Sequence, residues 1–193
     1  MTKRDVGPVE ELEGNVERFA GKETRRRVME GCEGIASYSK EEVAEWVKGA
    51  MERLDFMVDV ETRGRIMVTC GQKCAKMNSR PIEMAKRRRV KFDSEDEFLE
   101  AEIRKPTIGT SLAREGVVMR YTYKPREYRQ GLRCYCSLVN GLPSDEKISL
   151  TYCNCARGFV EEYWEEVLGR PVRVELTESS ISGSTVCKFV VSL

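Results

Sequence analysis

Half of the eight cysteines lie in one short segment, RCYCSLVNGLPSDEKISLTYCNC, which ends at Cys155. They form two C-x-C pairs, Cys134 with Cys136 and Cys153 with Cys155. The chain contains no histidine, so neither a Ser-His nor a Cys-His catalytic pair can form. Four thiolates in two pairs can close a tetrahedral zinc site or hold an iron–sulfur cluster. We therefore expect a metal centre here, with a metal-free thiol site or cysteines that only pack as the alternatives.

The spacing within each pair predicts how the thiols are presented. In a strand over 132–139, Cys134 and Cys136 would point to the same face, because side chains two apart share a face of a sheet. Cys153 and Cys155 stand at the entry to a predicted helix, where two residues can chelate together only in the turn that precedes it. Unpaired N–H groups at that point also lower a thiol pKa. We expect the sulfur atoms of the two pairs to lie within about 4 Å of each other, since Zn–S bonds are about 2.3 Å.

The cysteines of a third pair, Cys70 and Cys74, are four positions apart in the sequence CGQKC. On a helix these two thiols project together, either into the metal site or into the core. Gly71 between them costs a helix about 1 kcal/mol relative to alanine, which is tolerable where another backbone approaches closely. Six thiols would exceed one closed zinc site, so the surplus would favour a cluster with reactive thiols or exchangeable ligands. Lys73 and Arg133 could hold some of them as thiolates.

The remaining sequence predicts an α+β fold, with a helical N-terminal half followed by a β-β-α-β-β unit built on an antiparallel sheet. Ser39 and Glu42 form a capping box before a helix with a long apolar face. Gly21 and Pro81 are expected to end helices, and Gly169 ends the last one. The predicted helices cover 9–19, 23–35, 40–54, 60–77, 94–104 and 152–168, and the predicted strands 116–123, 132–139, 172–176 and 186–191. We divide the chain into a helical part, 1–110, and a cysteine-rich α+β part, 111–193, which together form one compact domain.

Composition excludes several classes of protein. Charged residues make up 34% of the chain but nearly balance, at a formal net charge of +1, so we expect no nucleic-acid partner. The basic run 86–89 is more typical of a solvated helix end than of a phosphate contact. No apolar run approaches the roughly 20 residues of a membrane span, and the first residues have no apolar signal core. We expect a cytoplasmic protein, in which thiols stay reduced, and we expect the other two cysteines, Cys32 and Cys187, to be core residues.

The C-terminal part, through YCNCARGFVEEYWEEVLGRPVRVEL and ESSISGSTVCKFVVSL, resembles the 4-vinyl reductase domain family. Its ending is also similar to that of the L-2-amino-thiazoline-4-carboxylic acid hydrolase family. Both look related to the ligand-binding fold of haem nitric-oxide sensor domains and TRAPP transport subunits. The resemblance covers roughly residues 116–193, and its clearest marks are Gly169, Glu175, Gly183, Cys187 and Phe189.

The resemblance implies a small-molecule-binding α+β domain with a hydrophobic pocket, in some members with a metal held by cysteines. Members of the 4-vinyl reductase family often carry a cysteine shortly before the glycine turn, where Ser179 and Ser180 stand here. A site that uses that cysteine must therefore be rearranged in this chain. The CGQKC helix and the two C-x-C pairs resemble those of an uncharacterised bacterial and archaeal group near these families.

Three functions follow as hypotheses. The first is a zinc-binding, cysteine-rich domain that binds a small molecule, with Cys70, Cys74, Cys134, Cys136, Cys153 and Cys155 as candidate ligands. The second is an enzyme, either a thiol- or metal-dependent hydrolase of a small cyclic amide-like substrate or an iron–sulfur reductase. The third is an assembly protein. A homodimer is compatible with each of them.

Overall fold

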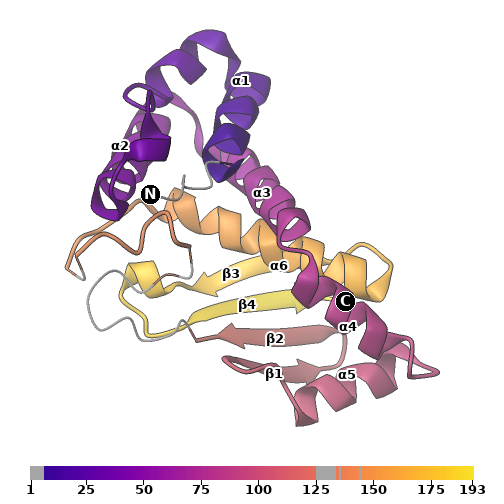
Figure 1. Cartoon of the computed structure of the whole chain (residues 1–193). Helices are drawn as coiled ribbons and strands as arrows, with labels where there is room; N and C mark the ends of the chain where they lie inside the picture. Colours follow the sequence, from indigo (N-terminus) through magenta and orange to yellow (C-terminus); the bar gives the residue numbers. More distant parts are fainter. Residues whose placement is uncertain (1–6, 125–133, 135, 144) are drawn as a thin grey trace.

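The computed structural model describes residues 7–124, 134, 136–143 and 145–193. Mostly helical N-terminal residues are followed by a four-stranded antiparallel sheet with a helix between its second and third strands, which confirms the predicted α+β class (Figure 1). The helices are α1 (Gly7–Val28), α2 (Lys40–Met57), α3 (Val60–Met77), α4 (Arg80–Arg89), α5 (Glu95–Arg104) and α6 (Cys153–Leu168). The strands are β1 (Thr110–Glu115), β2 (Val118–Tyr123), β3 (Arg173–Glu178) and β4 (Cys187–Ser192).

Local sequence explains where several of these helices begin and end. The capping boxes at Ser39 and Ser94 are both present, so α2 and α5 begin where the sequence predicts. Gly21 has a φ of 85°, which breaks α1 into two helical segments at the predicted stop. Pro81 does not simply follow the end of α3: it lies in the first turn of α4, where a missing N–H costs nothing. The prediction missed α4 because only Ile82 and Ala85 of this short helix are buried, which leaves too weak an apolar periodicity.

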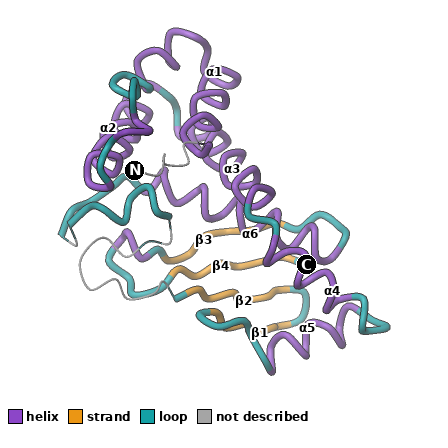
Figure 2. The backbone as a smooth tube through the Cα atoms, in the orientation of Figure 1, coloured by secondary structure: helices purple, strands orange, loops and turns teal. Residues whose placement is uncertain are grey.

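The sheet has the strand order β1-β2-β4-β3, and every neighbouring pair is antiparallel. Strand β4 therefore lies between β2 and β3, and β3 is one edge of the sheet (Figure 2). The register between β3 and β4 shifts between Leu176 and Glu178, which marks a bulge on that edge. Helix α6 returns the chain from β2 to β3, and Trp164 of this helix stacks edge-on against Tyr121 of β2.

One predicted strand is wrong. In 132–139, residues 132, 133 and 135 lie outside the described residues, while Cys134 and Cys136 are not in a strand and the residues after Cys136 form turns. The second strand of the predicted β-β pair is instead β1, which precedes β2 and pairs with it through the tight turn at Gly116. Val139 and Leu142 are buried in the helical core, and the half-buried Cys134, Cys136 and Leu138 pack against it, so tertiary packing takes the place of the predicted strand pairing for these residues.

Two hydrophobic clusters form the interior, and both draw on the two halves of the chain. The helical core contains Val16, Trp46, Met51, Leu54, Ile66 and Met67, together with Val139, Leu142, Ile148 and Tyr152 from the second half. The sheet core contains Trp164, Met119, Val174, Phe189 and Val191, together with Ile82, Phe98 and Leu99 from the first half. Packing thus crosses the boundary predicted near residue 110, and the division into 1–110 and 111–193 stays a prediction.

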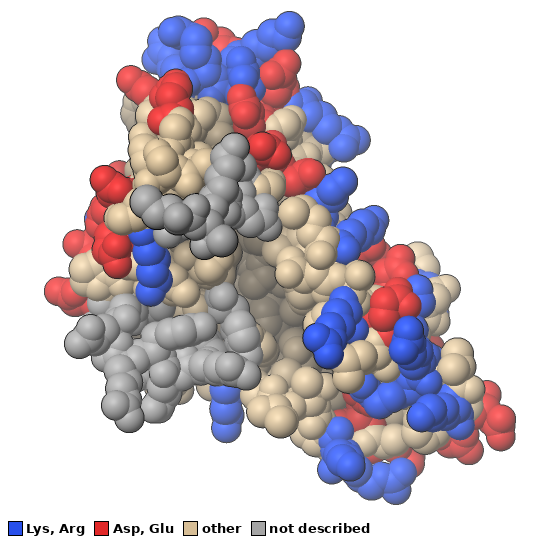
Figure 3. Space-filling model, viewed as in Figure 1, with Lys and Arg blue, Asp and Glu red and all other residues tan. Residues whose placement is uncertain are grey.

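Charges of both signs are interspersed on the face shown in Figure 3, with basic groups gathered over α4. Within the basic run, Lys86 forms an ion pair with Glu166. Arg88 forms a bidentate ion pair with the buried Glu102. Part of this run therefore serves to hold α4 against α6 and α5. None of the described helices is long and apolar enough to cross a membrane.

Candidate functional site

Two glycines bring the backbones of α3 and α6 into direct contact. A Cβ atom added at Gly71 would lie 1.9 Å from the carbonyl oxygen of Cys155, and one at Gly158 would lie 2.1 Å from that of Val68. Both distances are far below any real contact, so only glycine fits at either position. The close approach expected of Gly71 is therefore to α6, and it places the thiols of CGQKC beside the first turn of that helix.

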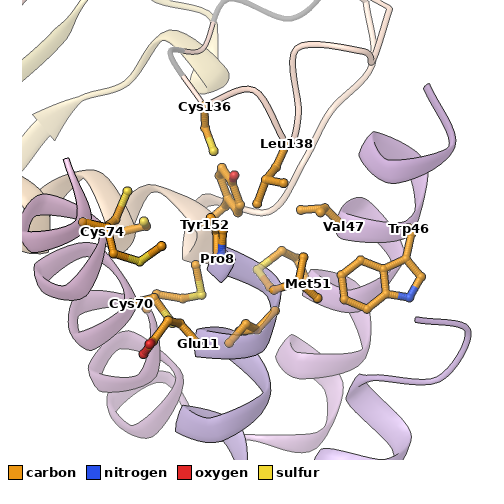
Figure 4. Close-up of a pocket in the computed structure, with 15 residues that line it drawn as sticks. Pro8, Glu11, Trp46, Val47, Met51, Cys70, Cys74, Cys136, Leu138 and Tyr152 are labelled. Carbon is orange, nitrogen blue, oxygen red and sulfur yellow. The ribbon is translucent and has the colours of Figure 1, made fainter. Parts of the chain in front are cut away.

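A small cavity next to this contact collects thiols from three separate segments. Cys70 and Cys74 of α3, Cys155 of α6 and Cys136 of the preceding loop all line it (Figure 4). In the close-up, Cys136 points toward the cavity from the loop side and Cys70 from α3. The cavity measures about 60 Å³, which is room for an ion or a few waters but not for an organic substrate. The rest of its wall is mostly apolar and includes Trp46, Val47, Met51, Met67 and Leu138.

The loop that carries Cys136 is fixed from the opposite side by α2. A Cβ atom at Gly141 would lie 2.4 Å from the carbonyl oxygen of Lys40, so the loop backbone rests directly on the start of that helix. Lys48 of α2 also pairs with Glu146 at 2.6 Å. These contacts hold the loop across the mouth of the cavity without any strand pairing.

Two polar side chains form hydrogen bonds with thiols that line the cavity. The buried Asn15 of α1 donates a hydrogen bond from Nδ2 to the sulfur of Cys70 at 3.5 Å. The hydroxyl of Tyr152, also buried, hydrogen-bonds with Cys136, and burial raises the Tyr152 pKa well above its usual value. Amide and hydroxyl donors directed at sulfur stabilise the thiolate form when a cation is present.

Cys153 instead belongs, with Cys187, to a second set of thiols that contact serines, the serine-bonded thiol group. The sulfur of Cys153 is 2.9 Å from the hydroxyl of Ser179, and the sulfur of Cys187 accepts a hydrogen bond from the Ser180 amide at 3.4 Å. Burial raises the pKa of Cys134, and the neighbouring thiols of Cys136, Cys153 and Cys187 add to this shift. Ser179 and Ser180 are therefore both hydrogen-bonded to thiols.

Only two of the four C-x-C cysteines, Cys136 and Cys155, line this cavity, and the expected approach of all four sulfur atoms stays a prediction. Cys153 and Cys155 lie in the first turn of α6, where residues two apart point to different sides of the helix. Cys134 and Cys136 are not in a strand, so the same-face rule that was applied to them does not hold. One member of each pair faces α3, and Cys153 faces Ser179 instead. The third pair, Cys70 and Cys74, does meet Cys136 and Cys155 at one cavity.

Burial controls the electrostatics of these thiols. Desolvation raises the pKa of Cys70 and of Cys153 to about 11, that of Cys134 to about 12, and that of Cys155 well above its usual value. Lys73, which was expected to favour thiolates, is instead 3.7 Å from the carboxylate of Glu11. Arg133, the other expected cation, lies outside the described residues. Without a metal, the thiols of Cys70, Cys134, Cys153 and Cys155 are therefore held in the protonated, weakly nucleophilic form at neutral pH.

Within the described parts of the chain, no three or more Cys, Asp or Glu side chains are already placed to hold a metal ion together. Side-chain rotation of the four cavity thiols would be needed to close a shell around an ion.

The polar contacts were not found from the sequence, although one pattern could have indicated Asn15. It occupies a core-facing position between Leu12 and Val16 on α1, where a polar residue is unusual unless it has a buried partner. Tyr152 was treated only as the start of a helix, and Cys153 and Cys187 were not linked to Ser179 and Ser180. These contacts join positions distant in sequence, so no local pattern reveals them.

Residues 9–193 match the model of a family of unknown function, DUF6144. The chain belongs to this family. The match takes in α1 through β4, so the cavity thiols, both helix-contact glycines and the serine-bonded thiols all fall within the family region. No curated protein matches the chain. The resemblance of residues 116–193 to the 4-vinyl reductase domain stays a prediction.

Proposed function

We propose that this DUF6144 protein binds a thiophilic metal through Cys70, Cys74, Cys136 and Cys155. The observation that carries the proposal is the meeting of four thiols from three separate segments at one small cavity. Four cysteines are the number that a closed tetrahedral zinc site or a cubane cluster requires. The proposal keeps two of the four C-x-C ligands expected from the sequence and replaces Cys134 and Cys153 by the α3 pair.

The surroundings of the cavity suit a charged metal–thiolate centre in a dry site. A cation would favour loss of the thiol protons despite burial, and Asn15 and Tyr152 would donate hydrogen bonds to the resulting thiolates. Zinc is the metal that we propose, with an iron–sulfur cluster as the alternative, since both accept four cysteines. The centre would fasten α3, α6 and the loop of Cys136 to one another.

A thiol hydrolase has less support than a metal-binding protein. Such an enzyme needs a thiolate at neutral pH, whereas burial raises the pKa of Cys70, Cys134 and Cys153 to about 11 or 12. A metal-dependent hydrolase and a cluster reductase remain alternatives that share the same four ligands. We also propose a cytoplasmic location, which would keep all eight thiols free, as they are in the structure. The expected homodimer stays a prediction.

Metal analysis of anaerobically purified protein tests the proposal. We expect about one zinc per chain and a colourless solution; visible absorption with stoichiometric iron and sulfide would indicate the cluster instead. Cys70→Ser and Cys155→Ser should each lose most of the bound metal, because a missing ligand opens the shell. Cys32→Ser is the matched control, since Cys32 does not line the cavity and its replacement should leave the metal content unchanged.

Thiol labelling after chelation gives an independent measure. Removal of the metal should expose Cys70, Cys74, Cys136 and Cys155 together, read by mass spectrometry. Full metal content in the Cys70→Ser and Cys155→Ser proteins, or metal-free wild-type protein under anaerobic conditions, would overturn the proposal.

A further inference from the structure

The side of α4 that faces solvent combines positive charge with apolar side chains. One stripe along this side consists of residues at positions i, i+4, i+7 and i+11: Arg80, Met84, Arg87 and Lys91. Lys91 stands in the turn that continues the helix. All four are exposed, whereas Ile82 and Ala85 on the opposite side are buried in the sheet core. We propose that this α4 stripe binds the protein reversibly to an anionic phospholipid surface.

The charges of the stripe are not used to hold the fold together. The segment 80–91 contains six basic residues and one acidic residue, Glu83, although the whole chain has a formal net charge of only +1. Among the residues that the structure describes, no carboxylate forms an ion pair with Arg80, Arg87 or Lys91. The positive charge of the stripe is therefore free to attract an anion from outside the molecule.

The basic run at the end of α1 shows that a run of arginines does not by itself leave free charge. Arg26 and Arg27 both form ion pairs with Glu23, and Arg25 forms one with Glu13. These carboxylates come from the same helix, so the basic run of α1 is neutralised where it stands. The stripe of α4 has no such local partners, and this difference makes it the candidate docking surface.

The apolar side chains of α4 favour a lipid surface over a nucleic acid. Met84, in the middle of the stripe, is 53% exposed, and Val90, one turn after Arg87, is 81% exposed. A bilayer offers such side chains its acyl region just beneath the charged headgroups, whereas a phosphate backbone offers them no apolar partner. The stripe also carries no aromatic side chain on which a base could stack.

The position of α4 makes the stripe accessible to a flat surface. The helix lies at the rim of the molecule, away from α2 (Figure 1), and basic groups gather over it (Figure 3). No residue of the stripe lines the thiol cavity, so the inference does not rest on the metal site.

The expected strength of docking follows from the number of charges. A basic residue close to an anionic leaflet strengthens binding by about fivefold, so three of them give roughly a hundredfold. The attraction falls off within a Debye length, which is about 10 Å at about 0.1 M salt. Binding should therefore be reversible and should weaken steeply as salt is added.

Co-sedimentation of the full chain with vesicles tests the inference. We expect binding to vesicles of phosphatidylcholine mixed with phosphatidylglycerol, and none to vesicles of phosphatidylcholine alone. An increase from about 0.1 M to about 1 M salt should release the protein, because the Debye length falls to about 3 Å.

Paired substitutions locate the binding surface. Arg80→Gln combined with Arg87→Gln should weaken binding to the anionic vesicles by roughly 25-fold, since two charges of the stripe are removed. Arg26→Gln combined with Arg27→Gln is the matched control, because it removes two exposed charges from α1 and should leave binding unchanged. If either variant does not fold, judged by circular dichroism, the lipid and salt comparisons on the wild type still decide the question.

Met84→Ser separates a lipid surface from other anions. It keeps every charge and should weaken vesicle binding by about threefold to tenfold, because the apolar insertion is lost. Unchanged vesicle binding in Met84→Ser would contradict the inference.

Three further outcomes would overturn the inference: equal or absent binding on the two kinds of vesicle, equal losses in the α4 and α1 double variants, or binding to single-stranded RNA without binding to anionic vesicles. The last result would assign the stripe to a nucleic acid. Metal content is measured separately, so loss of one proposal leaves the other standing.

Discussion

The buried thiol of Cys70 is held in its neutral form by desolvation, and this makes the stability of the metal-free protein depend on pH. Its pKa is about 11 in the folded protein, against an ordinary value of 9.0. The folded state therefore binds the proton more tightly than the unfolded state does. The resulting stability is fully present below pH 9 and is lost as the pH rises through 9 toward 11.

A Cys70→Ala variant should show this dependence directly. Between about pH 8 and about pH 11, the metal-free wild type should lose about 2 kcal/mol more unfolding free energy than Cys70→Ala, measured by denaturant titration in reducing buffer with chelator. Met67→Ala, at a buried position without an ionisable group one turn earlier on α3, should shift stability equally at both pH values. A constant difference between wild type and Cys70→Ala across this range would contradict the raised pKa.

At the scale of elements, the glycine contact between α3 and α6 decides where the thiols meet. Gly71→Ala should destabilise the protein by roughly 3 kcal/mol, because its Cβ meets backbone atoms of α6 that cannot rotate away. The same change should lower the metal content, since the two helices must separate. Denaturant unfolding and metal analysis measure the two effects.

Gly64→Ala is the matched control on the same helix. A Cβ at Gly64 meets nothing within 4 Å, so alanine should stabilise the protein by about 0.5–1 kcal/mol through helix propensity alone. Opposite signs for two identical substitutions on α3 are the expected result. A stabilising Gly71→Ala would mean that the helices are not in contact there.

At the scale of the whole molecule, the two cores share α3 and α6 and should unfold as one unit. Each core contains one of the two tryptophans, Trp46 in the helical core and Trp164 in the sheet core. In each of the single-tryptophan variants Trp46→Phe and Trp164→Phe, the fluorescence transition should coincide with the transition seen by far-ultraviolet circular dichroism. Separate midpoints within either variant would indicate two independent units instead.

The sequence by itself determined most of the helices, because their signals are local. The capping boxes at Ser39 and Ser94, the Gly21 break and the span of α3 follow from side chains within a few residues of each other. It also indicated that Gly71 marks a close backbone approach and that Cys70 and Cys74 lie on the same side of α3, where both line the cavity. The α+β class followed from the change of pattern after residue 110.

Only the tertiary structure decided which thiols share a cavity. A C-x-C spacing says that two thiols are near in sequence, but the first turn of α6 sends Cys153 and Cys155 to different partners. The loop of Cys136 gains its position from the contact of Gly141 with α2, about a hundred residues away in the chain, and not from strand pairing. Contacts of this kind are set by how distant helices pack, and no window of sequence contains both partners.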